Sequence, residues 1–190
     1  MRIRLLTLAI LTSVVSVRAM PQKLPYTEKQ FEMAVACIKH FEGWHNMKDY
    51  VGYGHQLQKG ERYSARTLTR KQGDLLLRLD LVRNLYLFRN YGKDALLLSV
   101  LAYNVGPYRI LGTKKIPKSR LLRKIERGDR NIYNDYISFC RWHGRQVKSI
   151  KLRRQVAYDL FFVRRNNRPE WSIFVASFGI FLVTPDKLNL

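Results

Sequence analysis

Apolar residues recur every three or four positions along most of the chain, and this spacing predicts a mainly helical protein. Thr27 and Gln30 have the spacing of a capping box, in which each side chain bonds a backbone N–H of the other residue. We therefore expect a helix over residues 28–41. A second box, Thr69 with Gln72, opens an amphipathic helix that reaches residue 86.

Further helices follow from the same periodicity. Residues 93–105 are nearly all apolar, which predicts a fully buried central helix that is too short to cross a membrane. Ser119 caps a short helix that Gly128 ends, and residues 132–140 and 151–161 keep the helical spacing.

Residues 43–66 break this pattern with glycines and turns, and they are too few for a large sheet. We expect a small hairpin there, with strands near residues 50–52 and 62–63. Helices with one small β element give an α+β, mostly helical fold class.

Both ends of the chain have their own composition. Residues 1–19 resemble a secretory signal peptide, with Arg2 and Arg4 before an apolar stretch, so we expect an exported protein; an uncleaved anchor is the alternative. Residues 164–190 form a tail with an apolar run at 171–183, which is short for a transmembrane helix. Three alternatives remain open for this tail: it rests at a membrane interface, it covers the folded body, or it is a disordered relic.

The charge is extreme, with 35 Lys and Arg against 14 Asp and Glu, a net charge of +21. Such a surface attracts polyanions, whether nucleic acid, anionic lipid or cell-wall polymer, or it only keeps the protein soluble. No nucleic-acid-binding motif is present, so nucleic acid is not the favoured partner. Cys37 and Cys140 lie in helical patterns, which favours two buried thiols over a disulfide, and the histidines match no metal-ligand spacing. We predict no metal and no cofactor.

The stretch from Phe41 to His55 concentrates the candidate chemistry. Glu42 lies at the exit of the first predicted helix, where the helix dipole favours the protonated carboxyl. Asp49 is a second carboxylate, and the glycines beyond it allow close backbone approach. Flat faces for sugar rings are offered by Trp44, Tyr50 and Tyr53.

This stretch also carries a family resemblance. FEG followed by VGYGH resembles the active-site signature of phage-type lysozymes, the endolysin-like glycoside hydrolases. YNVG at 103–106, SRLLRKIERGD at 119–129, the Trp142–Arg145 turn and LRRQVAYDLF at 152–161 are similar to further motifs of that family. The matches span residues 26–163 and are most similar to the lysozyme-like proteins of conjugative transposons.

The resemblance implies a two-lobed fold, with a small lobe at 26–66 and a helical lobe at 67–163. It also implies a muramidase that cleaves the β-1,4 bond between N-acetylmuramic acid and N-acetylglucosamine, with Glu42 as general acid. Either Arg153 or Arg154 would pair with Glu42, with an exposed basic face as the alternative. Asn104 is implied as a hydrogen-bonding residue of the cleft, or else as a helix C-cap contact.

The chain departs from the family in its hairpin. His55 follows Glu42 by thirteen positions, about seven residues fewer than is usual in the family. The hairpin is therefore shorter by roughly the ends of two short strands. Asp49 is the only carboxylate between Glu42 and His55. It is either the general base or a solvated turn residue. Tyr50 takes the place of the family threonine, and His55 either hydrogen-bonds in the cleft or orients the hairpin.

The implied partner is the peptidoglycan glycan strand, and a conjugation or secretion apparatus for which the wall is opened is a further expected partner. Two alternatives remain: a non-catalytic peptidoglycan-binding protein, because the hairpin is short, and a basic protein that binds nucleic acid or a membrane surface, because of the charge.

Overall fold

The computed structural model describes residues 25–64 and 66–163. The signal peptide predicted at 1–19 and the tail at 164–190 lie outside the described residues. Within the described residues, no helix combines the length and the apolar character that a membrane crossing needs.

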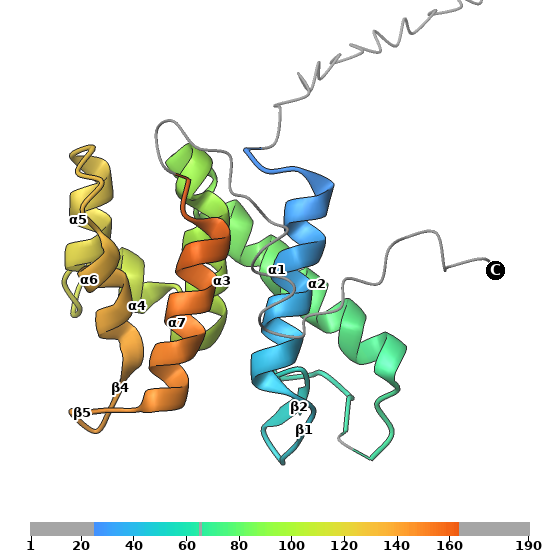
Figure 1. The fold of residues 1–190 in the computed structure, drawn as a ribbon. Helices are drawn as coiled ribbons and strands as arrows, with labels where there is room; N and C mark the ends of the chain where they lie inside the picture. The colour runs from blue at the N-terminus through green and yellow to red at the C-terminus, as the bar shows by residue number, and fades with distance from the viewer. Residues whose placement is uncertain (1–24, 65, 164–190) are drawn as a thin grey trace, which may run out of the picture.

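The described chain folds into helices with two very small sheets (Figure 1). The helices are α1 (Glu28–Glu42), α2 (Arg70–Leu87), η1 (Arg89–Asp94), α3 (Ala95–Val105), α4 (Tyr108–Leu111), α5 (Arg120–Glu126), α6 (Tyr133–Ile137), η2 (Ser138–Cys140) and α7 (Lys148–Phe161). The strands are β1 (His45–Asn46), β2 (Tyr50–Gly52), β3 (His55–Gln56), β4 (Arg141–Trp142) and β5 (Arg145–Gln146). The predicted α+β, mostly helical fold class is confirmed.

Local signals set the ends of the first two long helices. Both capping boxes form, because Thr27 and Thr69 accept the N–H of the residue three positions on, and the glutamine there bonds back to the cap. At the other end of α1, Gly43 has φ +66°, a conformation that favours glycine, and its N–H bonds Lys39 O.

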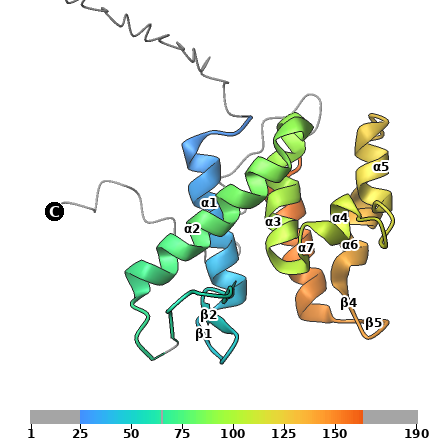
Figure 2. The same ribbon diagram turned by 180° about the vertical axis from the view of Figure 1, so that it is seen from behind.

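α3 is the centre of the packing. Every residue from Ala95 to Ala102 is buried, and α3 packs against α1, α2 and α7. Figures 1 and 2 show α3 and α7 side by side, with α1 and α2 on one flank and α5 and α6 on the other. Leu97, Leu98 and Leu101 are fully buried, and burial of each such side chain contributes about 2 kcal/mol.

A second, smaller cluster lies beneath the three-stranded sheet. Val51 of β2 packs with Leu68 and Leu76, apart from the main core, and Trp44 covers this cluster from one side. The strands pair antiparallel in the order β1-β2-β3, with Val51 opposite Asn46 and His55. The two clusters divide the described chain into a small sheet-bearing part and a large helical part, while the boundary at 66/67 stays a prediction.

The structure corrects one predicted strand. Residues 62–63 form no strand, and β2 pairs instead with His55–Gln56. Gly52 and Gly54 have φ of +62° and +91°, so they reverse the chain at once, and the return strand begins seven residues earlier than expected.

Candidate functional site

Glu42 is the last residue of α1, and its carboxyl lies against the turn between β2 and β3. A Cβ placed on Gly54 would be 3.5 Å from Glu42 Cδ, so this turn covers one side of the carboxyl. The Glu42 side chain is 15% exposed. The helix end and the glycine turn therefore hold a carboxyl group close to the surface but largely shielded.

Two donors bind the same oxygen of Glu42. Arg153 Nη1 of α7 donates to Glu42 Oε1 at 2.8 Å, and Asn104 Nδ2 at the end of α3 also donates to Oε1. Arg153 additionally donates to the Phe41 carbonyl. Three helices that are distant in sequence thus meet at this carboxyl, and charge-assisted hydrogen bonds of this kind are among the stronger ones in proteins.

Arg154 is linked to Glu42 through the side chain of Asn104. It is 3% exposed, and it donates to Asn104 Oδ1 at 2.6 Å and to the Phe139 carbonyl at 3.3 Å. Burial lowers the pKa of Arg154. Because arginine has only donors, Asn104 must turn its amide oxygen to Arg154 and its amino group to Glu42. Of the two arginines predicted as partners, the structure brings Arg153 to Glu42 and Arg154 to Asn104.

Asn104 therefore makes side-chain contacts within the site rather than at the helix end. The C-cap of α3 is Gly106, whose own N–H bonds the Ala102 carbonyl. The Asn104 side chain is left for Glu42 and Arg154.

A groove with a volume of about 700 Å³ opens beside this carboxyl. Its walls come from the β2–β3 turn, from α2 and from the segment that joins α3 to α4. The lining residues are Tyr50, Gly54, His55, Gln56, Gln58, Asp80, Arg83, Asn84, Leu87, Ala102, Tyr103, Asn104, Val105, Gly106, Pro107 and Tyr108. Glu42 is not itself in the lining, but Asn104, which donates to its carboxyl, and Gly54, where a Cβ would contact it, are both lining residues.

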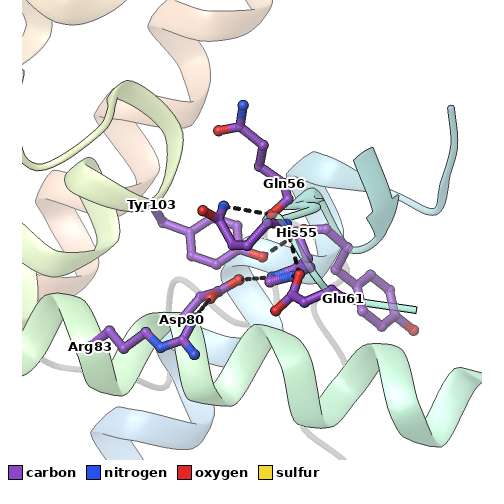
Figure 3. A network of polar contacts seen from close by, with 8 residues as sticks. His55, Gln56, Glu61, Asp80, Arg83 and Tyr103 are labelled. Atoms are coloured by element: carbon purple, nitrogen blue, oxygen red, sulfur yellow. Dashed lines mark hydrogen bonds and ion pairs between the residues drawn. The ribbon is translucent and has the colours of Figure 1, made fainter. Parts of the chain in front are cut away.

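His55 of β3 bonds two carboxylates, Asp80 of α2 and Glu61 of the segment that follows β3 (Figure 3). Its Nδ1 lies 2.6 Å from Asp80 Oδ2, and its Nε2 lies 2.9 Å from Glu61 Oε2. The ring is 3% exposed, and the bond to Asp80, followed by that to Glu61, raises the pKa of His55. The pKa of Glu61 is lowered by the Gln58 backbone N–H and by His55. This network orients the hairpin, one of the two roles predicted for His55.

The sequence did not single out Asp80 or Glu61. Asp80 is one of several charged residues on the polar side of α2, and Glu61 lies in an irregular segment, so neither has a local signal. Their link to His55 spans 25 and 6 positions and arises only in the fold.

The remaining predicted residues lie at different depths. Tyr50 lines the groove and is exposed. Tyr53 is partly buried, and its carbonyl accepts a hydrogen bond from the Tyr103 hydroxyl at 2.8 Å. Burial, followed by the nearby charges of Asp80 and Glu42, raises the pKa of Tyr103.

Asp49 lies at the exposed turn before β2 and is not part of the groove lining. Its side chain has no hydrogen bond or ion pair to any residue that the structure describes, although its carbonyl accepts the Leu57 N–H at 3.0 Å. The structure thus does not bring Asp49 together with Glu42, Asn104 and Arg153.

Trp44 differs from expectation. The Arg70 guanidinium lies 4.1 Å from the ring centroid, and Tyr53 meets the ring edge-on. Gly73 is so close that a Cβ there would come within 2.7 Å of the ring. The indole is therefore packed within the small sheet-bearing part and is not an open platform for a sugar.

Comparison with known proteins bears on the fold. No family model matches the chain, and no curated protein matches it. Among solved structures, the chain is similar to the muramidase domain of SpmX from Asticaccaulis excentricus, with a TM-score of 0.55 and 23% identity. The match covers 70% of this chain and 96% of that domain. The fold is lysozyme-like. At this identity the likeness shows the fold alone.

Proposed function

We propose that the protein is a peptidoglycan hydrolase, a muramidase that cleaves the β-1,4 bond between N-acetylmuramic acid and N-acetylglucosamine. The observation that carries this proposal is the Glu42 carboxyl, held by Arg153 and by the groove-lining Asn104 in a lysozyme-like fold.

In this mechanism Glu42 is the general acid. It gives a proton to the glycosidic oxygen while the bond to the anomeric carbon breaks, and the ring passes through an oxocarbenium-like transition state. Arg153 and Asn104 fix the carboxyl and stabilise the carboxylate that remains after proton transfer.

In an inverting reaction a second carboxylate directs water to the anomeric carbon as the glycosidic bond breaks. Asp49 is the proposed base, as the carboxylate of the hairpin, and Asp80 is its competitor, because Asp80 lines the groove. Comparison of Asp49→Asn with Asp80→Asn separates them, because only loss of the base abolishes turnover by protein that is still folded; Asp80→Asn also loses the bond to His55, so its turnover is measured at a temperature where circular dichroism shows it to be folded.

Glu42→Gln tests the central assignment. Purified protein is incubated with peptidoglycan, and new reducing ends are measured together with the sugar found at each end. We expect wild type to release muramic-acid ends and Glu42→Gln to lose at least about 100-fold in rate, the usual contribution of a general acid. Glu28→Gln, an exposed change at the opposite end of α1, is the matched control and should stay near wild type. Equal rates for wild type and Glu42→Gln would refute the assignment.

A non-catalytic peptidoglycan-binding role is the second candidate, and the position of Asp49 outside the groove favours it. This role predicts that wild type sediments with peptidoglycan and produces no reducing ends.

Export is part of the proposal, since peptidoglycan lies outside the cytoplasm. N-terminal sequencing of protein recovered from the cell envelope should begin near residue 20. We further propose that the protein opens the wall for a conjugation or secretion apparatus. Co-purification of the protein with components of such an apparatus from envelope extracts tests this.

A further inference from the structure

We propose that His45 holds the proton that Glu42 delivers, and that it passes this proton to the Oε2 atom of Glu42. The inference rests on the proposed function, because it names a positioning residue for the same acid.

The two oxygens of Glu42 are in different positions. Oε1 accepts from Arg153 and from Asn104, and Arg154 fixes the orientation of the Asn104 amide. Since both of these groups are donors, Oε1 is already satisfied as a charged oxygen. An added proton must therefore sit on Oε2, which would lie 3.6 Å from a Cβ placed on the groove-lining Gly54.

His45 is the group that faces Oε2. Its Nε2 lies 3.4 Å from this oxygen, and among the described residues Nε2 is buried and has no hydrogen-bond partner. A buried ring nitrogen without a partner is costly unless it serves a neighbour. Catalytic hydrogen bonds are commonly long in the absence of substrate and shorten once it binds, so 3.4 Å is within reach of a proton transfer.

The placement of His45 gives it better access to solvent than Glu42 has. His45 lies on β1, opposite Gly52, and its side chain is 23% exposed against 15% for Glu42. Other atoms of the side chain reach solvent, while Nε2 is buried beside Glu42 Oε2. An imidazole is suited to this role because each ring nitrogen can act as donor or as acceptor, depending on the tautomer.

The proton balance closes without a further reactant. The Nε2–H bond of the cationic imidazole breaks as an Oε2–H bond forms on Glu42. Glu42 passes this proton to the glycosidic oxygen as the glycosidic bond breaks. The attacking water loses one proton when its oxygen joins the anomeric carbon, and through solvent this proton replaces the one that His45 gave up.

His45→Gln is the decisive variant. Glutamine keeps a donor near Oε2 but cannot carry a proton between turnovers. On soluble peptidoglycan fragments we expect kcat to fall about 100-fold, as for loss of a general acid–base group, with KM within about twofold. In His45→Ala, added imidazole should restore part of kcat. His40→Gln, an exposed histidine at the end of α1, is the matched control.

A second readout does not depend on turnover. The ¹⁵N resonance of His45 Nε2 should shift between wild type and Glu42→Gln, while that of His40 should not. A His45→Gln protein with the kcat of wild type would overturn the inference and leave the muramidase proposal standing, provided that Glu42→Gln is inactive. An unchanged His45 resonance would also overturn it. A wild-type protein that cuts no glycan would overturn both proposals.

Discussion

His55 offers a direct test of how the hairpin is fixed to the helical part. One imidazole bonds Asp80 on α2 and Glu61 in the following segment, at 2.6 and 2.9 Å. Glutamine at position 55 has no charge and cannot reach both carboxylates. A hydrogen bond to a charged group contributes about 1.5–3 kcal/mol, and both carboxylates are partly exposed, so we expect His55→Gln to lose about 2 kcal/mol of unfolding free energy.

The loss should depend on pH in a defined direction. The pKa of His55 is raised above its ordinary value of 6.5, chiefly by Asp80. The stabilisation is therefore fully present below pH 6.5 and is lost as the pH rises through the pKa of the folded state. The pKa of Glu61 is lowered from 4.5, so its share is present above pH 4.5 and is lost under more acidic conditions. The effect of His55→Gln should be largest between these two values and smaller in alkaline solution.

Urea unfolding followed by circular dichroism measures this difference at about pH 5.5 and at about pH 9. His40→Gln carries the same substitution at an exposed site and should leave the midpoint unchanged at both values. A His55→Gln protein as stable as wild type at pH 5.5, or a deficit that grows towards pH 9, would refute the reasoning.

Two further predictions concern the buried parts of the site and of the core. Arg154→Met leaves the Asn104 amide oxygen and the Phe139 carbonyl without their donor, so unfolding free energy in urea should fall by about 2–4 kcal/mol, and glycan cleavage should slow because the Asn104 amide can then turn away from Glu42. Leu97→Ala opens a cavity at a fully buried position of α3 and should lower the unfolding free energy by about 3 kcal/mol; a loss below about 1 kcal/mol would show that the core closes around the missing atoms.

Local patterns predicted most of the fold. Both ends of α1 were predicted to within one residue: a capping box precedes its first residue, and Gly43 follows its last residue. The buried α3 was predicted because apolar residues cover all its faces, and it starts two residues later than expected because Gly92 and η1 precede it. The predicted strand at 62–63 was wrong, since a two-residue return strand such as His55–Gln56 has no alternating pattern that could reveal it.

The site was less accessible to sequence reasoning. The lysozyme resemblance pointed to Glu42 and to a pair of arginines, but not to which arginine reaches the carboxyl. That choice depends on the rotation of α7 against α1 and α3, which places Arg153 at Glu42 and Arg154 at Asn104. Asp80 and Glu61 belong to the site through contacts with His55 that no short motif encodes, whereas His45 lies only three positions after Glu42.

The two buried cysteines make the opening of the folded protein measurable by thiol labelling. Cys37 and Cys140 are buried as free thiols, and burial raises the pKa of Cys37 to about 12. Only the thiolate attacks alkylating reagents and disulfides, so Cys37 stays inert while α1 remains packed on its neighbours. The rate at which a small reagent labels the Cys37 sulfur therefore measures how often the interior opens. The measurement needs no substitution in the protein.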